Sequence, residues 1–464
     1  MFAQRCSFFT LLCLACLGGL LLFPLEIMPS LLTQPGKAPL PDLSVDQMSF
    51  SDTQLYDWQI DQADFENALY DRDKLISTEF QIPPGLEKAV SFWLSIYTKY
   101  STHQVVLFDS HYPEVVYEVL DFTDNHHNSK SRLIYEVVRK NTLAKKIKRY
   151  KNAFKSLKRN PHPKKPTPEQ LNILSALKAA GLKKDFGVLS RSMRSQTGQR
   201  ENILFGLERA APYWSKMEKI FSNIGVPIEI TRLSLLESSF NNAVTSSAGA
   251  RGVWQFIKTG AKDFLVVDEK LKLDERLSIL KSTAGAARLL RRNYFSLNSW
   301  PLALTAYNYG VRPLIRIPHR LRSHSHIAEL YKPSRKKARL GFAGRSYFPG
   351  FLAVLRAEKY RELFYPKITG RDNKPAIFKK ITKTISVRKF SKLNGITPEA
   401  LIGLNSDIRS KTSLLPKNFH VLVPANLNQD NSNLLASPIY FRDFMKANGL
   451  YSYAGSKSSP AKGK

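Results

Sequence analysis

Glu237 is the acidic residue whose sequence context is best suited to catalysis. Ile230, Leu233 and Glu237 are spaced as i, i+3 and i+7, so they would share one face of a helix. A carboxyl in line with an apolar stripe lies at the edge of a core, where desolvation raises its pKa. Such a carboxyl holds its proton near neutral pH and can serve as a general acid. The competing interpretation is an ordinary ion pair of Glu237 with Arg232 or Arg251, which is the commoner role of an isolated glutamate.

Neutral polar groups and aromatic rings follow Glu237 along the chain. A polar loop and a glycine-rich turn come first, with Asn241, Asn242, Ser246, Ser247 and residues 248–252. Gln255 then follows in the motif Gly-Val-Trp-Gln-Phe at residues 252–256, and Tyr307 and Asn308 end a predicted helix. An acid beside amides, hydroxyls and a ring suits a neutral, hydroxyl-rich substrate such as a sugar, and suits a phosphate backbone poorly. The Trp254 ring has two equally weighted interpretations, a core filler or a substrate contact.

In this order and spacing, the motifs resemble the catalytic domain of lytic transglycosylases of the soluble-lytic-transglycosylase type. The resemblance covers about residues 201–360 and rests on three motifs, Glu237-Ser238, residues 252–256 and Ala-Tyr-Asn at residues 306–308. The tryptophan of the second motif and Asp-Glu-Arg at residues 274–276 look most like the membrane-bound lytic murein transglycosylase D group. A later helix of that group often carries a tyrosine near the active site, and Tyr347 is the matching residue here.

The resemblance implies cleavage of the β-1,4 bond between N-acetylmuramic acid and N-acetylglucosamine in peptidoglycan, with formation of a 1,6-anhydro ring. It implies a single residue, Glu237, that acts first as acid and then as base. Ordinary glycosidases use two carboxylates, whereas no Asp or Glu occurs between Glu237 and Asp263, which is consistent with a one-carboxylate scheme. Neither a cofactor nor a metal is expected. Two alternatives stay open, a lysozyme-like peptidoglycan hydrolase and an inactive peptidoglycan-binding scaffold.

The resemblance also implies roles for five residues around the catalytic glutamate. Ser238 would be its hydrogen-bond neighbour or a contact to substrate. Gln255 and Asn308 would hold acetamido or hydroxyl groups of the sugar. Tyr307 would orient the substrate or the glutamate, and Tyr347 would be a supporting contact.

The chain has 464 residues, which is more than a single hydrophobic core normally organises. We expect a mainly α fold with a lysozyme-like helical catalytic domain at residues 201–365. A mostly helical N-terminal region of unknown role at residues 83–200 would precede it, and a small α+β LysM-like module at residues 376–425 would follow it. A linker at residues 31–82 and a disordered tail at residues 454–464, rich in Ser, Lys, Pro and Gly, complete the expected organisation.

The C-terminal module is predicted from the order of its elements. Short strands are expected at residues 377–378 and 420–424, and helices at residues 387–394 and 397–405 between them. This order resembles a degenerate LysM module, a unit that binds glycans containing N-acetylglucosamine. The usual Gly-Asp-Thr-Leu after the first strand is absent, and Thr-Lys-Thr-Ile-Ser stands there instead. Whether the module binds glycan or only packs against the catalytic domain therefore stays open.

The N-terminus predicts export. Arg5 precedes an uncharged, mostly apolar run from residue 6 to residue 23, so residues 1–30 are expected to be a signal peptide or signal anchor. All three cysteines, Cys6, Cys13 and Cys16, lie in this segment, which excludes a disulfide framework or a cysteine-ligated metal in the body of the protein. We expect a protein of the periplasm or cell envelope that associates with a membrane through its N-terminus. Whether the segment is cleaved, retained or lipidated stays open.

The net charge of +32 gives the protein a surface that attracts polyanions. Residues 137–168 contain no acid and many Lys and Arg residues, while Leu143, Ile147, Tyr150, Phe154 and Leu157 recur at helical spacing. This pattern predicts a basic amphipathic helix, whose charge is interpreted as a solvated face in preference to a contact with an anionic surface. Nucleic acid is not expected as a partner, because the chain has an export signal and lacks an aromatic–basic recognition motif. The free carboxylates of peptidoglycan stem peptides are a simpler partner for the charge.

Overall fold

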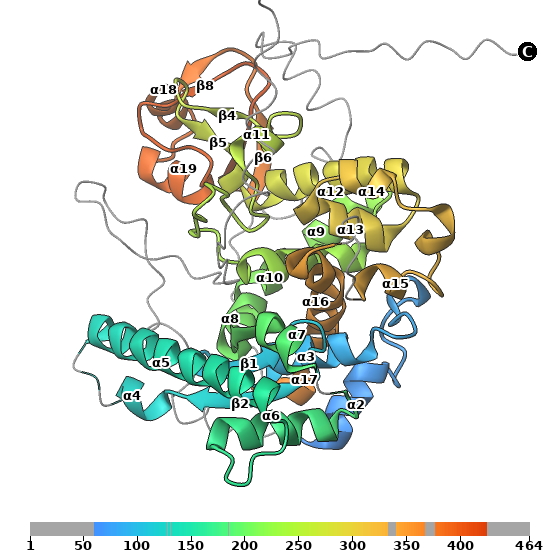
Figure 1. Cartoon of the computed structure of the whole chain (residues 1–464). Helices are drawn as coiled ribbons and strands as arrows, with labels where there is room; N and C mark the ends of the chain where they lie inside the picture. Colours follow the sequence, from blue (N-terminus) through green and yellow to red (C-terminus); the bar gives the residue numbers. More distant parts are fainter. Residues whose placement is uncertain are drawn as a thin grey trace, which may run out of the picture.

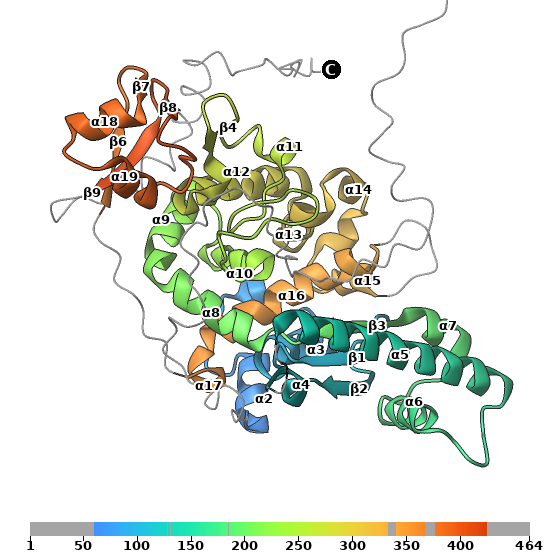
Figure 2. The ribbon, with the colours of Figure 1, turned by 90° about the vertical axis from the view of Figure 1, so that its left-hand side faces the viewer.

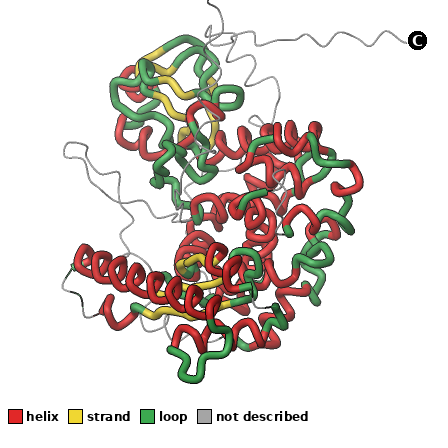
Figure 3. The backbone as a smooth tube through the Cα atoms, in the orientation of Figure 1, coloured by secondary structure: helices red, strands yellow, loops and turns green. Residues whose placement is uncertain are grey.

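The computed structural model describes residues 60–127, 129, 131–183, 185–332, 340–366 and 376–424. Helices dominate the described chain and the sheets are small, as Figure 3 shows in red and yellow. The expected fold class is confirmed, since a mainly helical body is followed by a small α+β unit. The predicted signal segment, the first part of the predicted linker and the predicted tail lie outside the described residues. Within the described ranges, no helix is long and apolar enough to cross a membrane.

Helix α16 (Phe342–Lys359) lies at the centre of the body (Figure 1). It packs against α3 (Glu87–Thr98), α13 (Trp300–Tyr309) and α10 (Leu233–Ser238). Its middle turns are buried on all sides, as expected of a helix that runs through a core. Because α3 precedes residue 100 and α13 follows residue 300, the N-terminal region and the predicted catalytic domain share one hydrophobic core.

The linker prediction is wrong for residues 61–82. These residues form α2 (Gln62–Tyr70) and a 3₁₀ turn (Thr78–Phe80), and Phe80 is fully buried. Asp71 ends α2 in a left-handed conformation, and its carboxylate accepts hydrogen bonds from two backbone amides and from the Tyr360 hydroxyl (2.8 Å). The buried guanidinium of Arg356 donates to the Leu69 carbonyl (2.8 Å). These contacts join the segment to α16 and to the residues that follow it, so it belongs to the folded body.

The other helices of the body are short or of moderate length. They are α8 (Arg200–Ala210), α9 (Trp214–Ile224), α11 (Lys258–Ala261), α12 (Ile279–Leu297), α14 (Arg312–Ile315), α15 (Ala328–Tyr331) and α17 (Arg361–Phe364). Gly225 ends α9 with φ 74°, a conformation that other residues rarely adopt. Pro301 stands in the first turn of α13 and Gly310 follows its last residue, so both boundaries of this helix agree with the sequence pattern.

A three-stranded antiparallel sheet in the order β2–β1–β3 separates two hydrophobic cores. Its strands are β2 (Val116–Asp121), β1 (Gln104–Asp109) and β3 (Met193–Thr197). Val106 and Phe108 of β1 point into the main core with α3, whereas Val105 and Leu107 point into a second core. Helices α5 (Arg132–Arg159), α6 (Pro168–Ala179) and α7 (Phe186–Ser192) cover that second face, and α4 (Thr123–His127) precedes them. The predicted basic helix is thus confirmed as α5.

The C-terminal unit has the predicted element order. Its first strand, β6 (Ala376–Lys380), pairs with its last, β9 (His420–Pro424). Two helices lie between them in sequence, α18 (Val387–Leu393) and α19 (Pro398–Leu404). A second pair is formed by the short strands β7 (Ile385–Ser386) and β8 (Leu414–Leu415). Its core also includes two residues of the helical body. Val266 directly precedes β4 (Val267–Asp268), and Leu273 is the first residue of β5 (Leu273–Asp274), the strand that pairs with β4. The unit is therefore packed onto the body through a shared core.

Candidate active site

Glu237 lies in the last turn of the short helix α10 and is half-buried. A 3₁₀ turn (Ile228–Arg232) leads into this helix, and both Ile230 and Leu233 are fully buried. The helix stops directly after Glu237-Ser238, because Ser239 and Phe240 adopt left-handed backbone conformations with φ 49° and φ 54°. The apolar stripe predicted from the sequence thus faces the core and leaves the glutamate at its edge.

Neither arginine that could have neutralised Glu237 is paired with it. Arg232 forms a bidentate ion pair with Glu358 of α16 (3.0 Å for each contact) and a further pair with Glu218. Arg251 lies beside Asp274, with 3.5 Å between Nη1 and Oδ2. The interpretation of Glu237 as a structural ion-pair partner is therefore wrong. Its side-chain hydrogen bond comes from the hydroxyl of Tyr347, which donates to Oε1.

The electrostatics of Glu237 follow from this enclosure. Burial raises the pKa of its carboxyl from 4.5 to about 7, and the hydrogen bond from Tyr347 opposes part of that rise. Burial also raises the pKa values of the Tyr347 and Tyr307 hydroxyls well above 10, and the charge of Glu237 adds to both shifts. Both phenols consequently stay protonated and remain hydrogen-bond donors at neutral pH. The group that titrates near pH 7 is the carboxyl.

Tyr307 and Trp254 support the site from the side of α13. The Tyr307 hydroxyl donates to the Trp254 carbonyl (2.8 Å), and this tyrosine is half-buried. The Trp254 ring is fully buried, stacks on Phe221 and donates from Nε1 to the Thr283 hydroxyl (2.9 Å). With no exposed ring surface, Trp254 fills the core, and this decides between its two predicted roles.

Ser238, Gln255 and Asn308 occupy different positions around the glutamate. The buried Ser238 hydroxyl donates to the carbonyls of Val253 (3.0 Å) and Ser234 (3.2 Å), so it ties α10 to the 252–256 motif. Gln255 is half-buried and has a left-handed backbone (φ 48°), and its side-chain amide donates to the Gly252 carbonyl (2.9 Å). Asn308 is exposed at the end of α13, where a ligand can reach its amide.

Arg276 holds the loop that carries Gln255, a role that sequence reasoning missed. Its guanidinium forms two 2.8 Å contacts with Asp274 and donates to the carbonyls of Gly249 (3.0 Å) and Phe256 (3.2 Å). The backbone of Arg276 also passes so close to Gly252 that a Cβ there would lie 1.8 Å from its carbonyl oxygen. An Asp and an Arg two residues apart were the available signal, but the carbonyls that Arg276 reaches lie 27 and 20 residues earlier in the sequence.

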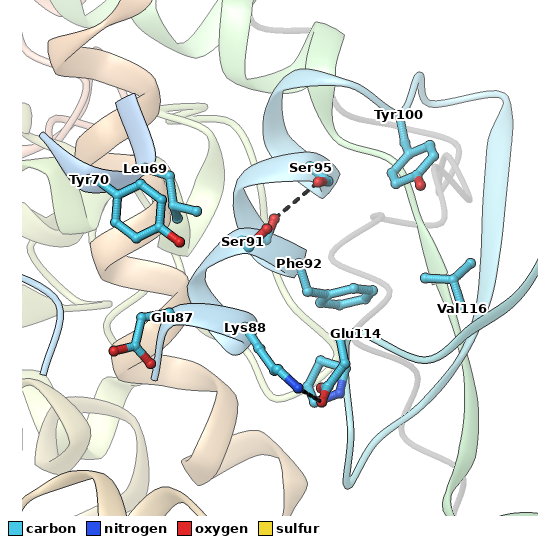
Figure 4. Close-up of a pocket in the computed structure, with 11 residues that line it drawn as sticks. Leu69, Tyr70, Glu87, Lys88, Ser91, Phe92, Ser95, Tyr100, Glu114 and Val116 are labelled. Atoms are coloured by element: carbon cyan, nitrogen blue, oxygen red, sulfur yellow. Dashed lines mark hydrogen bonds and ion pairs between the residues drawn. The ribbon is translucent and has the colours of Figure 1, made fainter. Parts of the chain in front are cut away.

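A pocket of about 300 Å³ lies elsewhere, between α2, α3 and the turn that joins β1 to β2 (Figure 4). An ion pair between Lys88 and Glu114 (3.2 Å) crosses it, and Ser95 donates to the Ser91 carbonyl within α3. None of the residues proposed around Glu237 lines this pocket. In the described part of the chain, no group of three His, Cys, Asp or Glu side chains is arranged to hold a metal ion.

Comparisons with known proteins match the segment of chain that carries these residues. Residues 222–325 match the model of the transglycosylase SLT domain, a range that includes Glu237, Ser238, Gln255, Tyr307 and Asn308. The chain is 22% identical over 221 residues to membrane-bound lytic murein transglycosylase D of Escherichia coli strain K12, and likewise to that of E. coli O6:H1. The match covers 47% of this chain and 47% of each relative, so the chain spans about half the length of the curated relatives. Residues 222–325 are therefore similar to a transglycosylase domain of the SLT type, and about half of the chain is similar to the D group of membrane-bound enzymes.

Proposed function

We propose that this protein is a peptidoglycan lytic transglycosylase. It would cleave the β-1,4 bond between N-acetylmuramic acid and N-acetylglucosamine and leave 1,6-anhydro-N-acetylmuramic acid ends. The observation that carries the proposal is a half-buried carboxyl, Glu237, whose pKa of about 7 is set by burial and by one phenol. Within the described ranges, no second carboxylate pairs with it or shifts its pKa. A retaining or an inverting glycosidase places a second carboxylate roughly 5–9.5 Å from the first, and none acts on the titration of Glu237.

The reaction requires one group that first donates a proton and then accepts one. With its pKa of about 7, Glu237 is substantially protonated near neutral pH and can donate its proton to the glycosidic oxygen as the bond to C1 of the muramic acid breaks. The resulting carboxylate then accepts the proton of the muramic acid 6-hydroxyl while that oxygen bonds to C1. No water is consumed, and the glutamate ends in the protonation state in which it began.

The neighbouring residues would serve this cycle in distinct ways. Tyr347 donates a hydrogen bond that stabilises the carboxylate formed after the first proton transfer. Tyr307 and Ser238 fix the loop and helix on either side of the glutamate. Gln255 and the exposed Asn308 would contact acetamido or hydroxyl groups of the glycan.

The wider context of the enzyme is part of the same proposal. The relatives are named as membrane-bound murein transglycosylases, which supports peptidoglycan as the substrate and the cell envelope as the location of this protein. The apolar run at residues 6–23 supports export, with membrane association through the N-terminus. The C-terminal unit has the strand–helix–helix–strand order of a LysM module, and we propose on that order a degenerate LysM-like unit, with glycan binding and packing against the body both kept as its possible tasks.

Digestion of purified sacculi by Glu237→Gln tests the proposal. We expect the variant to lose lysis, because the amide cannot deliver a proton, while the unmodified protein releases muropeptides with 1,6-anhydro ends. Asp263→Asn is the matched control, since Asp263 is the next acid along the chain and is exposed and paired with Arg292. Reducing ends in place of anhydro ends would identify a hydrolase. A fully active Glu237→Gln protein would remove this residue from the mechanism.

A further inference from the structure

The outward face of α5 is a strongly cationic surface. The helix contains eleven Lys and Arg residues and a single acid, Glu136, which lies 3.5 Å from Arg139. Nine of the basic side chains are exposed: Arg132, Lys140, Lys145, Lys148, Arg149, Lys151, Lys155, Lys158 and Arg159. Arg149 reaches Glu169 (3.8 Å), whereas no ion pair is seen for Lys148, Lys151 or Lys155 with the described residues.

The same face carries an apolar cluster at the start of the helix. Leu133 is 75% exposed, Ile134 49%, Val137 51% and Val138 38%, although the opposite side of α5 packs Tyr150, Phe154 and Leu157 into a core. Single exposed apolar residues are ordinary, but four within six positions form a patch that water solvates poorly. Such a cluster goes beyond the singly scattered apolar residues of an ordinary solvated face.

Cations and apolar side chains lie along one line of the helix. The line consists of Leu133, Val137, Lys148, Lys151 and Lys155. Successive members are 4, 11, 3 and 4 residues apart, and each spacing is close to a whole number of helical turns. The line faces away from the body, since the opposite side of α5 covers the sheet. Figures 1 and 2 both show α5 at the end of the molecule away from the C-terminal unit, with α10 and α16 between them.

We propose that α5 docks on the surface of a bilayer that contains anionic phospholipids. Lys148, Lys151 and Lys155 would meet the headgroup phosphates, while Leu133 and Val137 enter the boundary between headgroups and acyl chains. The apolar cluster decides for lipid over the carboxylates of a wall polymer, which offer no apolar partner. Docking by α5 does not involve α10, the helix that carries Glu237. This inference is independent of the proposed function.

Amine labelling of the full-length protein, read out by mass spectrometry, tests the docking residue by residue. We expect Lys148, Lys151 and Lys155 to be labelled more slowly on vesicles of phosphatidylglycerol and phosphatidylcholine, and as fast as in solution on phosphatidylcholine alone. Raising the salt to about 1 M should restore labelling, because the Debye length shrinks to about 3 Å. Attachment through the N-terminus does not mimic this result, since the readout is local to α5.

Two comparisons sharpen the test. The exposed lysines Lys262, Lys270 and Lys383 serve as internal controls, and their labelling should not change on either vesicle. L133S/V137S should raise the lipid concentration that half-protects α5 by about tenfold, because two partly inserted side chains are lost. The double variant I257S/L393S, which also removes exposed apolar side chains but away from α5, should leave that concentration unchanged.

Three results would overturn the proposal. Equal labelling of the α5 lysines with and without anionic vesicles would show that the helix does not meet lipid. Protection by purified sacculi but not by vesicles would assign the surface to the wall polymer. Slow labelling in free protein that L133S/V137S makes fast would show that another segment of this chain covers the patch.

Discussion

Replacing Tyr347 by Phe removes one oxygen from the site and tests how the pKa of Glu237 is set. The phenol donates to Oε1, and this bond stabilises the ionised carboxyl, so it lowers a pKa that burial raises. A hydrogen bond to a charged group is worth about 1.5–3 kcal/mol, and one pKa unit corresponds to about 1.4 kcal/mol. Without the donor, the pKa of Glu237 should therefore rise by about one to two units above its value of about 7.

The pH dependence of kcat/KM on soluble glycan strands reports this shift. In the unmodified enzyme, activity should fall above about pH 7, where Glu237 loses the proton that it must donate. In Tyr347→Phe this alkaline limb should move up by about one to two pH units. The maximal rate should nevertheless drop by roughly 10- to 100-fold, because the carboxylate formed in the first step is no longer stabilised.

Tyr331→Phe is the matched control for this experiment. Tyr331 is as buried as Tyr347, and its hydroxyl shares a 2.6 Å hydrogen bond with Thr305 but makes no contact with Glu237. This change should cost stability and leave the alkaline limb in place. A limb that stays fixed in Tyr347→Phe, or moves to lower pH, would refute the reasoning, because the phenol would then not stabilise the charged form.

Two further predictions concern stability and loop position. The pKa of Glu237 is about 7 in the folded protein and 4.5 in the unfolded chain, so between these pH values the folded protein holds a proton that the unfolded chain has lost. The free energy of unfolding should therefore fall by about 3 kcal/mol as the pH rises from 4.5 to above 7. Glu237→Gln should therefore unfold at higher urea than the unmodified protein at pH 8 and at similar urea near pH 4; equal midpoints at pH 8 would contradict the raised pKa. Arg276→Lys loses the contacts to the Gly249 and Phe256 carbonyls and should lower kcat by about 10- to 100-fold without moving the alkaline limb. An unchanged kcat would show that the loop is held in place without Arg276.

The part of the site that lies within one helix was predictable from local spacing. Ile230 and Leu233 are buried and Glu237 lies at the core edge, as the i, i+3, i+7 pattern requires. The pairing of Tyr347 with Glu237 joins residues 110 positions apart, and no local rule predicts such a contact. Only the family resemblance pointed to this tyrosine. The pattern also left open whether an arginine would neutralise the glutamate, which depends on where Glu358 lies in α16.

The N-terminal region was harder to predict for two physical reasons. β1 carries the continuous apolar run at residues 105–108 because both faces of the sheet are buried, and such a run lacks the alternation that marks a strand. In α2, only Ala68 and Leu69 are fully buried, so the segment has little apolar periodicity. The segment is held to the body by hydrogen bonds of the Asp71 carboxylate and by the bond from Arg356 to the Leu69 carbonyl. Polar contacts of this kind leave no periodic pattern in the sequence.

The contact between the helical body and the C-terminal unit changes how that unit should be regarded. Lys281 of α12 is buried between Glu275 (3.2 Å) and Asp407 of the unit (2.6 Å), and its ammonium lies over the Phe419 ring. Removing one partner of a buried ion pair typically costs about 3–5 kcal/mol, so the two parts depend on each other for stability. Glu275 also directly precedes Arg276, which holds the loop of Gln255. The C-terminal unit thus supports the chain segment that shapes the site, and the sequence Thr-Lys-Thr-Ile-Ser after β6, in place of Gly-Asp-Thr-Leu, is compatible with that structural task.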